Sequence, residues 1–210
     1  MPLKDVAHAL LEWANIQTLT LIVGVGFACF YRKPFGRGIT LMLFSVIFNA
    51  VLKALWKIPL PLELHIAGWA FPSGHMQGLT VLAGWIIWEW NHRWAWVAGG
   101  CLLAVMGACI IAAGYHDLRD ILGGIAAGAF MIACLAELNK RCPWINRHPE
   151  FLGLLLAPIS LGMLYWLNAY DVTIVHYPCI AAFGGLIILS LGWIISAHFE
   201  IPSHWVGKTL

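Results

Sequence analysis

Two histidines and an aspartate occur where long apolar segments of the chain begin. His75 follows Pro72-Ser73-Gly74 at the start of one such segment, and His116 precedes Asp120 by four residues at the start of another. That spacing lets the carboxylate bind one imidazole nitrogen across a helical turn, which fixes the tautomer and leaves the other nitrogen as a nucleophile or base. The pair therefore predicts nucleophilic or base catalysis.

The same part of the sequence contains groups that suit an anion. Lys53 lies four residues after Asn49 near the end of an apolar segment, so both side chains are expected on one helix face. Ser73 is placed as a helix cap with free backbone N–H groups behind it, and such a helix start is an anion site. The structural alternative for Lys53 is a lysine that extends along apolar surface toward water.

Composition assigns the chain to the membrane proteins. Of its 210 residues, 61% are hydrophobic and 10% are charged, whereas soluble domains have about 25% charged residues. Twelve tryptophans point the same way, since tryptophan is enriched at membrane interfaces. A net charge of +2 is too small to indicate a nucleic-acid partner. From the apolar composition we expect membrane lipids to surround the chain.

Seven apolar segments have the length of a membrane span, about 20 residues. We therefore predict an all-α fold, a single transmembrane domain over residues 1–210 with about six or seven spans. Polar residues within spans are costly and are candidates for function. The predicted spans are 15–31, 39–56, 73–90, 95–114, 120–138, 152–169 and 178–197.

Positive charge predicts which ends of the spans face the cytoplasm. Lysine and arginine gather in cytoplasmic loops, and seven of them lie in the first, third and fifth loops, against Lys57 and Arg119 in the second and fourth. The candidate residues should then face outward, which in a bacterial inner membrane means the periplasm. The seven are Arg32, Lys33, Arg37, Arg93, Lys140, Arg141 and Arg147.

Several other features have structural interpretations. Gly124 and Gly128 form a pair of small residues typical of a close helix contact. His65 and His176 are expected to be solvated loop residues. A group of tryptophans is expected to form an interfacial belt at the cytoplasmic end; it comprises Trp85, Trp88, Trp90, Trp94 and Trp96.

The sequence resembles the type 2 phosphatidic acid phosphatase superfamily. Phe71 to His75 contains its central Pro-Ser-Gly-His motif, and His116 with Asp120 matches the end of its last motif, which reads Ser-Arg-x5-His-x3-Asp. Lys53 and Pro61 match the two ends of its first motif. The similar region covers roughly residues 45–130, within a phosphatase-like core of four helices at about 39–138. A helix pair at about 152–197 lies outside the resemblance.

The resemblance implies a lipid phosphate phosphatase without metal or cofactor. It implies that His116 attacks phosphorus, that Asp120 orients it, and that His75 protonates the leaving oxygen. Lys53, Ser73 and the N–H groups of Gly74 and His75 would bind the phosphate oxygens. The substrate would be a phospholipid or a polyprenyl mono- or diphosphate.

Two motif arginines are replaced. Leu60 stands at the arginine of the first motif, and Cys109-Ile110 at the Ser-Arg of the last. The family's guanidinium groups bind phosphate, and losing two charge-assisted hydrogen bonds removes about 3–6 kcal/mol of binding. Arg119, which is three residues from His116, is the first candidate to compensate, with Lys57 and His65 as others on the same predicted side.

Two alternatives follow from these replacements. One is a non-hydrolytic relative that binds or translocates a polar lipid. The other is a phosphotransferase that passes a head group through the same histidine to an acceptor other than water. The presence of His75, His116 and Asp120 together favours an enzyme, because a site released from catalysis has little reason to keep all three.

Overall fold

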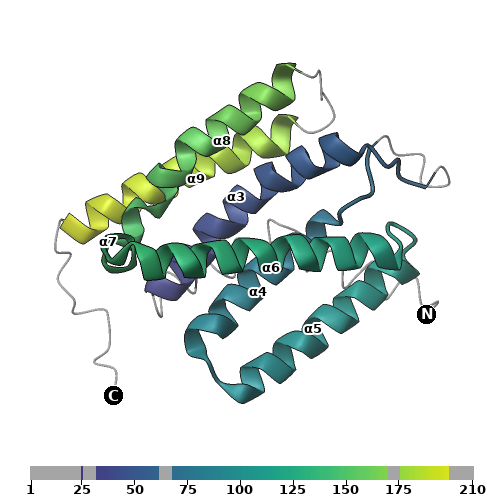
Figure 1. Ribbon diagram of the computed structural model, residues 1–210, viewed down its shortest axis with the longest axis horizontal. Coiled ribbons are helices and arrows are strands. Elements are labelled where there is room, and N and C mark those ends of the chain that lie inside the picture. The colour runs from purple at the N-terminus through teal and green to yellow at the C-terminus, as the bar shows by residue number, and fades with distance from the viewer. Residues whose placement is uncertain (1–24, 26–31, 62–67, 170–175, 199–210) are drawn as a thin grey trace.

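The computed structural model describes residues 25, 32–61, 68–169 and 176–198, and this part of the chain is helical (Figure 1). The predicted all-α class is confirmed, and the one β-bridge in the described part joins Pro59 to Trp69. The elements are α3 (Arg32–Trp56), α4 (Gly74–Trp90), α5 (Arg93–Ala112), α6 (Leu118–Arg141), α7 (Pro143–Arg147), the 3-10 helix η2 (Pro149–Phe151), α8 (Leu152–Ala169) and α9 (His176–His198).

The chain forms a bundle of membrane-spanning helices. Five segments of the described residues are long and apolar enough to cross a bilayer, and they belong to α3, α5, α6, α8 and α9. The sixth long helix, α4, has 17 residues, near the lower limit for a span. Six of the seven predicted spans thus correspond to helices. The first, 15–31, lies outside the described residues except for residue 25, and the start of the predicted domain and its last residues lie outside them too.

Two predicted loops contain helix. The segment from Arg32 to Gly38, predicted as a loop, is the first part of α3. Pro34 is tolerated there because N–H groups in the first turn of a helix need no intrahelical acceptor. Between α6 and α8, the predicted loop 139–151 includes the end of α6, all of α7 and η2. Both differences arise because charged and proline residues were read as breaks, although a helix end tolerates them.

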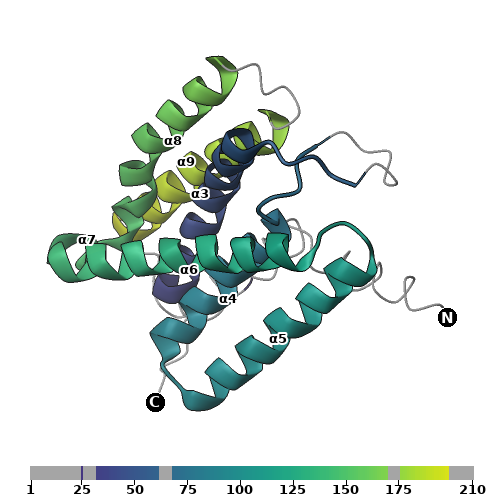
Figure 2. The same ribbon diagram turned by 45° about the vertical axis from the view of Figure 1, so that its right-hand side comes forward.

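Helix α4 lies at the centre of the first four long helices and contacts α3, α5 and α6. Its contact with α6 is close because glycines face it. A Cβ atom at Gly124 would lie 2.6 Å from Ser73 O, and one at Gly128 would lie 2.8 Å from Thr80 Cβ. The predicted glycine contact is therefore confirmed. Helices α8 and α9 run antiparallel, pack on each other and contact α3 (Figures 1 and 2).

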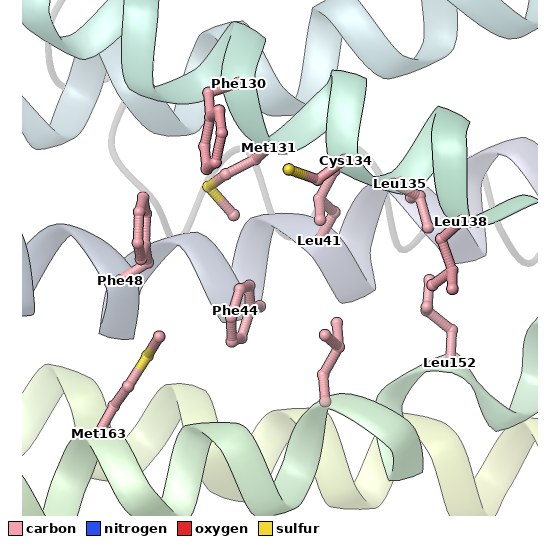
Figure 3. A pocket seen from close by; sticks show the side chains of 11 residues that line it. Leu41, Phe44, Phe48, Phe130, Met131, Cys134, Leu135, Leu138, Leu152 and Met163 are labelled. Carbon is pink, nitrogen blue, oxygen red and sulfur yellow. The ribbon is translucent and has the colours of Figure 1, made fainter.

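An apolar cavity of about 250 Å³ lies between α3, α6 and α8 (Figure 3). Aromatic, aliphatic and sulfur-containing side chains form its walls. Phe44 and Phe48 come from α3, Phe130 and Cys134 from α6, and Met163 from α8. A space of this composition inside a membrane bundle suits a hydrocarbon chain.

The tryptophans at the α4–α5 end form a belt with one exception. Trp88, Trp90, Trp94 and Trp96 are exposed, as expected of interfacial residues. Trp85 is 1% exposed and belongs to the core formed by α3, α4 and α6, so its assignment to the belt was wrong. Trp85 lies about one helical turn before Trp88, where α3 packs against α4 near Gly38 and covers it.

Candidate active site

The turn between α5 and α6 places His116 beside Asp120. Asp117 is the N-cap of α6, and its carboxylate accepts hydrogen bonds from the N–H groups of Arg119 (2.8 Å) and Asp120 (3.0 Å). Asp120 Oδ2 in return accepts from the Asp117 N–H at 3.2 Å, completing a capping box. The same Oδ2 lies 3.0 Å from His116 Nδ1. The predicted pair is present, although His116 precedes the helix, so the capping turn and not a helix face brings it to Asp120.

Both members of this pair are buried, His116 at 9% and Asp120 at 6% exposure. Burial lowers the pKa of His116, the hydrogen bond with Asp120 raises it, and the positive charge of Lys53 lowers it again, leaving it below its ordinary value. The imidazole is therefore neutral at neutral pH. With Nδ1–H donating to the carboxylate, the lone pair is on Nε2, the nitrogen available for attack or proton transfer.

The start of α4 meets the start of α6. Ser73 is the N-cap residue of α4 and its N–H donates to Asp120 O at 3.0 Å. Its side chain makes no capping hydrogen bond, so the predicted role of its hydroxyl as a cap is wrong. The Ser73 hydroxyl is fully buried and has no hydrogen-bond partner among the described residues. The Ser73 hydroxyl therefore does not bind the first-turn N–H groups of α4. Both the hydroxyl and these N–H groups lie beside the His116–Asp120 pair.

The first residue of α4, Gly74, lies close to α3. A Cβ atom there would lie 3.1 Å from Asn49 Oδ1, so the absence of a side chain permits the close approach. Asn49 Nδ2 donates to Pro72 O at 3.2 Å and to Gln77 Oε1 at 2.9 Å. Gln77 is fully buried and had not been predicted; a glutamine inside an apolar segment, four residues after Ser73, was the signal for it.

Lys53 also binds the segment that leads into α4. Its Nζ donates to Trp69 O at 2.7 Å, so Lys53 and Asn49 share a helix face as predicted. The side chain is half-buried, and no carboxylate of the described residues lies within ion-pair distance of it. Its ammonium group is thus hydrogen-bonded to a carbonyl and lies in electrostatic reach of the Asp120 carboxylate, which differs from a lysine that merely extends toward water.

Four of the predicted site residues come together from three parts of the chain. Lys53, Asp120 and His75 are the charged or titratable groups that act electrostatically on His116. They come from α3, the first turn of α6 and the first turn of α4. In Figures 1 and 2 these parts lie at one end of the bundle, together with the α5–α6 turn. His75 is exposed, whereas the His116–Asp120 pair behind it is buried.

The candidates for an additional cation are less closely placed. Arg119 is exposed in the first turn of α6, where its backbone N–H donates to the Asp117 carboxylate. Lys57 is exposed just beyond the end of α3, where its φ is +50°. His65 lies outside the described residues. His176 begins α9, and its side chain is also outside the described part.

The two positions at which the resemblance places an arginine are apolar. Leu60 is half-buried in the bridged segment, where its N–H donates to Gly68 O at 3.1 Å. Ile110 is 1% exposed and packs in the core below the site, with Met76 and Ile121. At these two positions the site therefore has hydrocarbon in place of guanidinium groups.

Comparison of the chain with protein-family models, curated proteins and solved structures finds no match. Within the described ranges, no group of three or more His, Cys, Asp or Glu side chains is arranged to hold a metal ion. The functional argument therefore rests on the residues of the site.

Proposed function

We propose that the protein is a lipid phosphate phosphatase that works through a phosphohistidine. One observation supports this best: a buried histidine, neutral and oriented by a buried carboxylate, lies within the field of a lysine that has no carboxylate partner in the described structure. Nucleophile, orienting group and cation are the parts that phosphoryl transfer to a histidine requires. The buried Ser73 hydroxyl beside them adds a donor for a phosphate oxygen.

The reaction has two steps. His116 Nε2 attacks phosphorus, the bond from phosphorus to the lipid oxygen breaks, and His75 gives a proton to that oxygen. Water then attacks the phosphohistidine, His75 takes the proton of the water, and inorganic phosphate leaves with His116 restored. Asp120 stabilises the imidazolium that forms in between, because its carboxylate already binds Nδ1–H.

Two features support a lipid as the substrate. The site lies at the end of a bundle of apolar spanning helices, where a head group meets water. The apolar cavity begins farther along α6, at Phe130, about 15 Å from Asp120 at a rise of 1.5 Å per residue. The lysine and arginine distribution favours the periplasmic face of a bacterial inner membrane as the location.

Phosphate release from a panel of lipid phosphates tests the proposal. Purified protein in detergent should release phosphate from a lipid monophosphate or diphosphate, and His116→Ala should abolish release. The exposed His92, at the other end of the bundle, gives the control, and His92→Ala should keep full activity. An active wild type whose rate survives His116→Ala contradicts the mechanism.

A second candidate function rests on the two apolar replacements. Leu60 and Ile110 remove the guanidinium groups, which favours a protein that binds a polar lipid without hydrolysing it. In that case lipid phosphate would bind and Lys53→Gln would weaken binding, while no phosphate or transferred head group would be produced. Product analysis in the same assay also separates hydrolysis from transfer to a second lipid.

A further inference from the structure

A second polar site lies at the opposite end of the bundle. A cavity of about 370 Å³ is formed there by residues of α3, α4, α6 and α7. Its size falls within the range of small-molecule sites, about 300–1,000 Å³. The polar side chains in its wall include Arg37, Trp85, Glu89, Asn139, Lys140 and Asn146.

Three buried polar atoms of this cavity have no hydrogen-bond partner in the part of the chain that is described. They are Arg37 Nε, Trp85 Nε1 and Asn139 Oδ1. Arg37 is 6% and Trp85 1% exposed, so neither nitrogen reaches bulk water freely. Because buried polar groups in proteins are nearly always hydrogen-bonded, a ligand that enters the cavity and displaces the side chains covering these atoms can supply partners for the two donors and the one acceptor.

The remaining polar groups hold the donors in place. Arg37 Nη1 pairs with Glu89, and Nη2 donates to Asn146 O (2.7 Å) and Oδ1 (2.9 Å). The guanidinium plane is thereby fixed, and Nε–H and the second N–H of Nη1 remain for a further partner. Lys140 adds a cation at the rim; its side chain is 71% exposed and its Nζ lies 3.9 Å from Glu137 Oε2. Donors of this kind suit the oxygens of a phosphate ester, while Asn139 Oδ1 suits a hydroxyl or ammonium of the same head group.

The position of the cavity relative to the membrane indicates where such a head group comes from. Exposed tryptophans surround this end, and tryptophan rings gather at the level of lipid head groups. They are Trp88, Trp90, Trp94 and Trp144. We propose that the cavity binds the phosphate-containing head group of a glycerophospholipid from the leaflet opposite to the candidate active site. The bound lipid joins α3, α4, α6 and α7 at that end.

Lipid-dependent thermal stability tests this site. Protein in detergent is titrated with dioctanoyl phosphatidylethanolamine or phosphatidylglycerol, and with dioctanoylglycerol and inorganic phosphate in parallel. Saturating phospholipid should raise Tm by roughly 5 °C, because it binds the folded state only. Lys140→Gln should raise the half-maximal lipid concentration about tenfold, the usual effect of losing one charge-assisted hydrogen bond. Trp85→Phe, which removes the indole N–H, should act in the same direction.

Matched variants separate this site from other effects. Arg141 also pairs with Glu137 but does not line the cavity, so Arg141→Gln should leave the titration unchanged. Trp96→Phe is the control for the tryptophan belt and should leave the titration unchanged. Lys53→Gln removes the cation of the candidate active site and should leave the lipid-induced rise in Tm unchanged. The proposal is overturned if dioctanoylglycerol gives the same shift, if inorganic phosphate alone reproduces it, if no ligand shifts Tm, or if Lys140→Gln and Arg141→Gln respond equally.

Discussion

Helix α3 has a cation near each end, and the two cations have different surroundings. Arg37 pairs with Glu89 and donates twice to Asn146, so its charge is neutralised by a carboxylate of the protein. Lys53 donates to the carbonyl of Trp69 and lies near two histidines. Arg37 thus joins helices through an ion pair, whereas Lys53 makes no ion pair within the described residues. Removing polar groups at the Arg37 end should lower the stability of the protein. Removing them at the Lys53 end should lower the rate of turnover.

The largest expected effect is at the orienting carboxylate. Asp120→Asn should lower kcat by about 10⁴, the size seen for the comparable change in serine proteases, because an amide cannot stabilise an imidazolium. Asp117→Asn is the control next to it, since asparagine caps a helix as well as aspartate does. Rates of purified variants with unchanged Tm measure the effect, and equal losses in the two variants would assign Asp120 to capping alone.

The two cations of α3 give the next comparison. Lys53→Met should lower kcat/KM roughly 10- to 100-fold, as expected for one charge-assisted contact to phosphate, with little change in Tm. Arg37→Met should destabilise the protein by about 3 kcal/mol, because Glu89 then lacks its partner, and should leave kcat unchanged. Thermal unfolding and kinetics on both variants test this. A reversed pattern would contradict the assignment of the two ends.

Arg119 should contribute less than Lys53. It is exposed in the first turn of α6, so Arg119→Ala is expected to lower kcat/KM by about tenfold, chiefly through KM. The kcat/KM of Arg119→Lys should lie between those of the wild type and Arg119→Ala, because lysine keeps the charge and lacks the planar guanidinium group. Arg147→Ala at the other end is the control. An unchanged KM with a lowered Tm would make Arg119 an anchor of α6.

The smallest effect concerns the apolar cavity. Cys134→Trp would fill part of it and should raise KM several-fold for a long-chain lipid phosphate, leaving KM for a short-chain analogue unchanged. Cys101→Trp, at an exposed cysteine of α5 outside the cavity, is the matched control. Equal KM changes with both chain lengths would argue against the cavity as the place of the hydrocarbon chain.

Hydropathy predicted six of the long helices because each must cover its backbone with apolar residues. Spacing predicted the His116–Asp120 contact because the two residues are close in sequence. Both inferences use local information. The glycine contact at Gly124 was also predictable, since small residues four apart leave one face of a helix flat.

Contacts between distant parts of the chain were not predictable in this way. Nothing in the segment 32–38 reveals that Arg37 binds Glu89 and Asn146, so its helix was read as a loop. Gln77 acquires its role from Asn49, 28 residues away. The hydroxyl of Ser73 has the right position for a cap but does not make the bond, a matter of side-chain direction that residue type does not determine.

The contact of α4 with α6 has a mechanical consequence. Because a single added carbon at Gly124 would collide with Ser73 O, the two backbones touch beside the site, and neither helix can slide without separating from the other. The His116–Asp120 pair and the start of α4 therefore move as one rigid body. The described parts of the site that this contact does not hold are the end of α3 and the bridged residues Pro59 and Trp69. Since Trp69 O binds Lys53 Nζ, a movement of Trp69 away from α3 would break that bond and leave the lysine free to bind an anion.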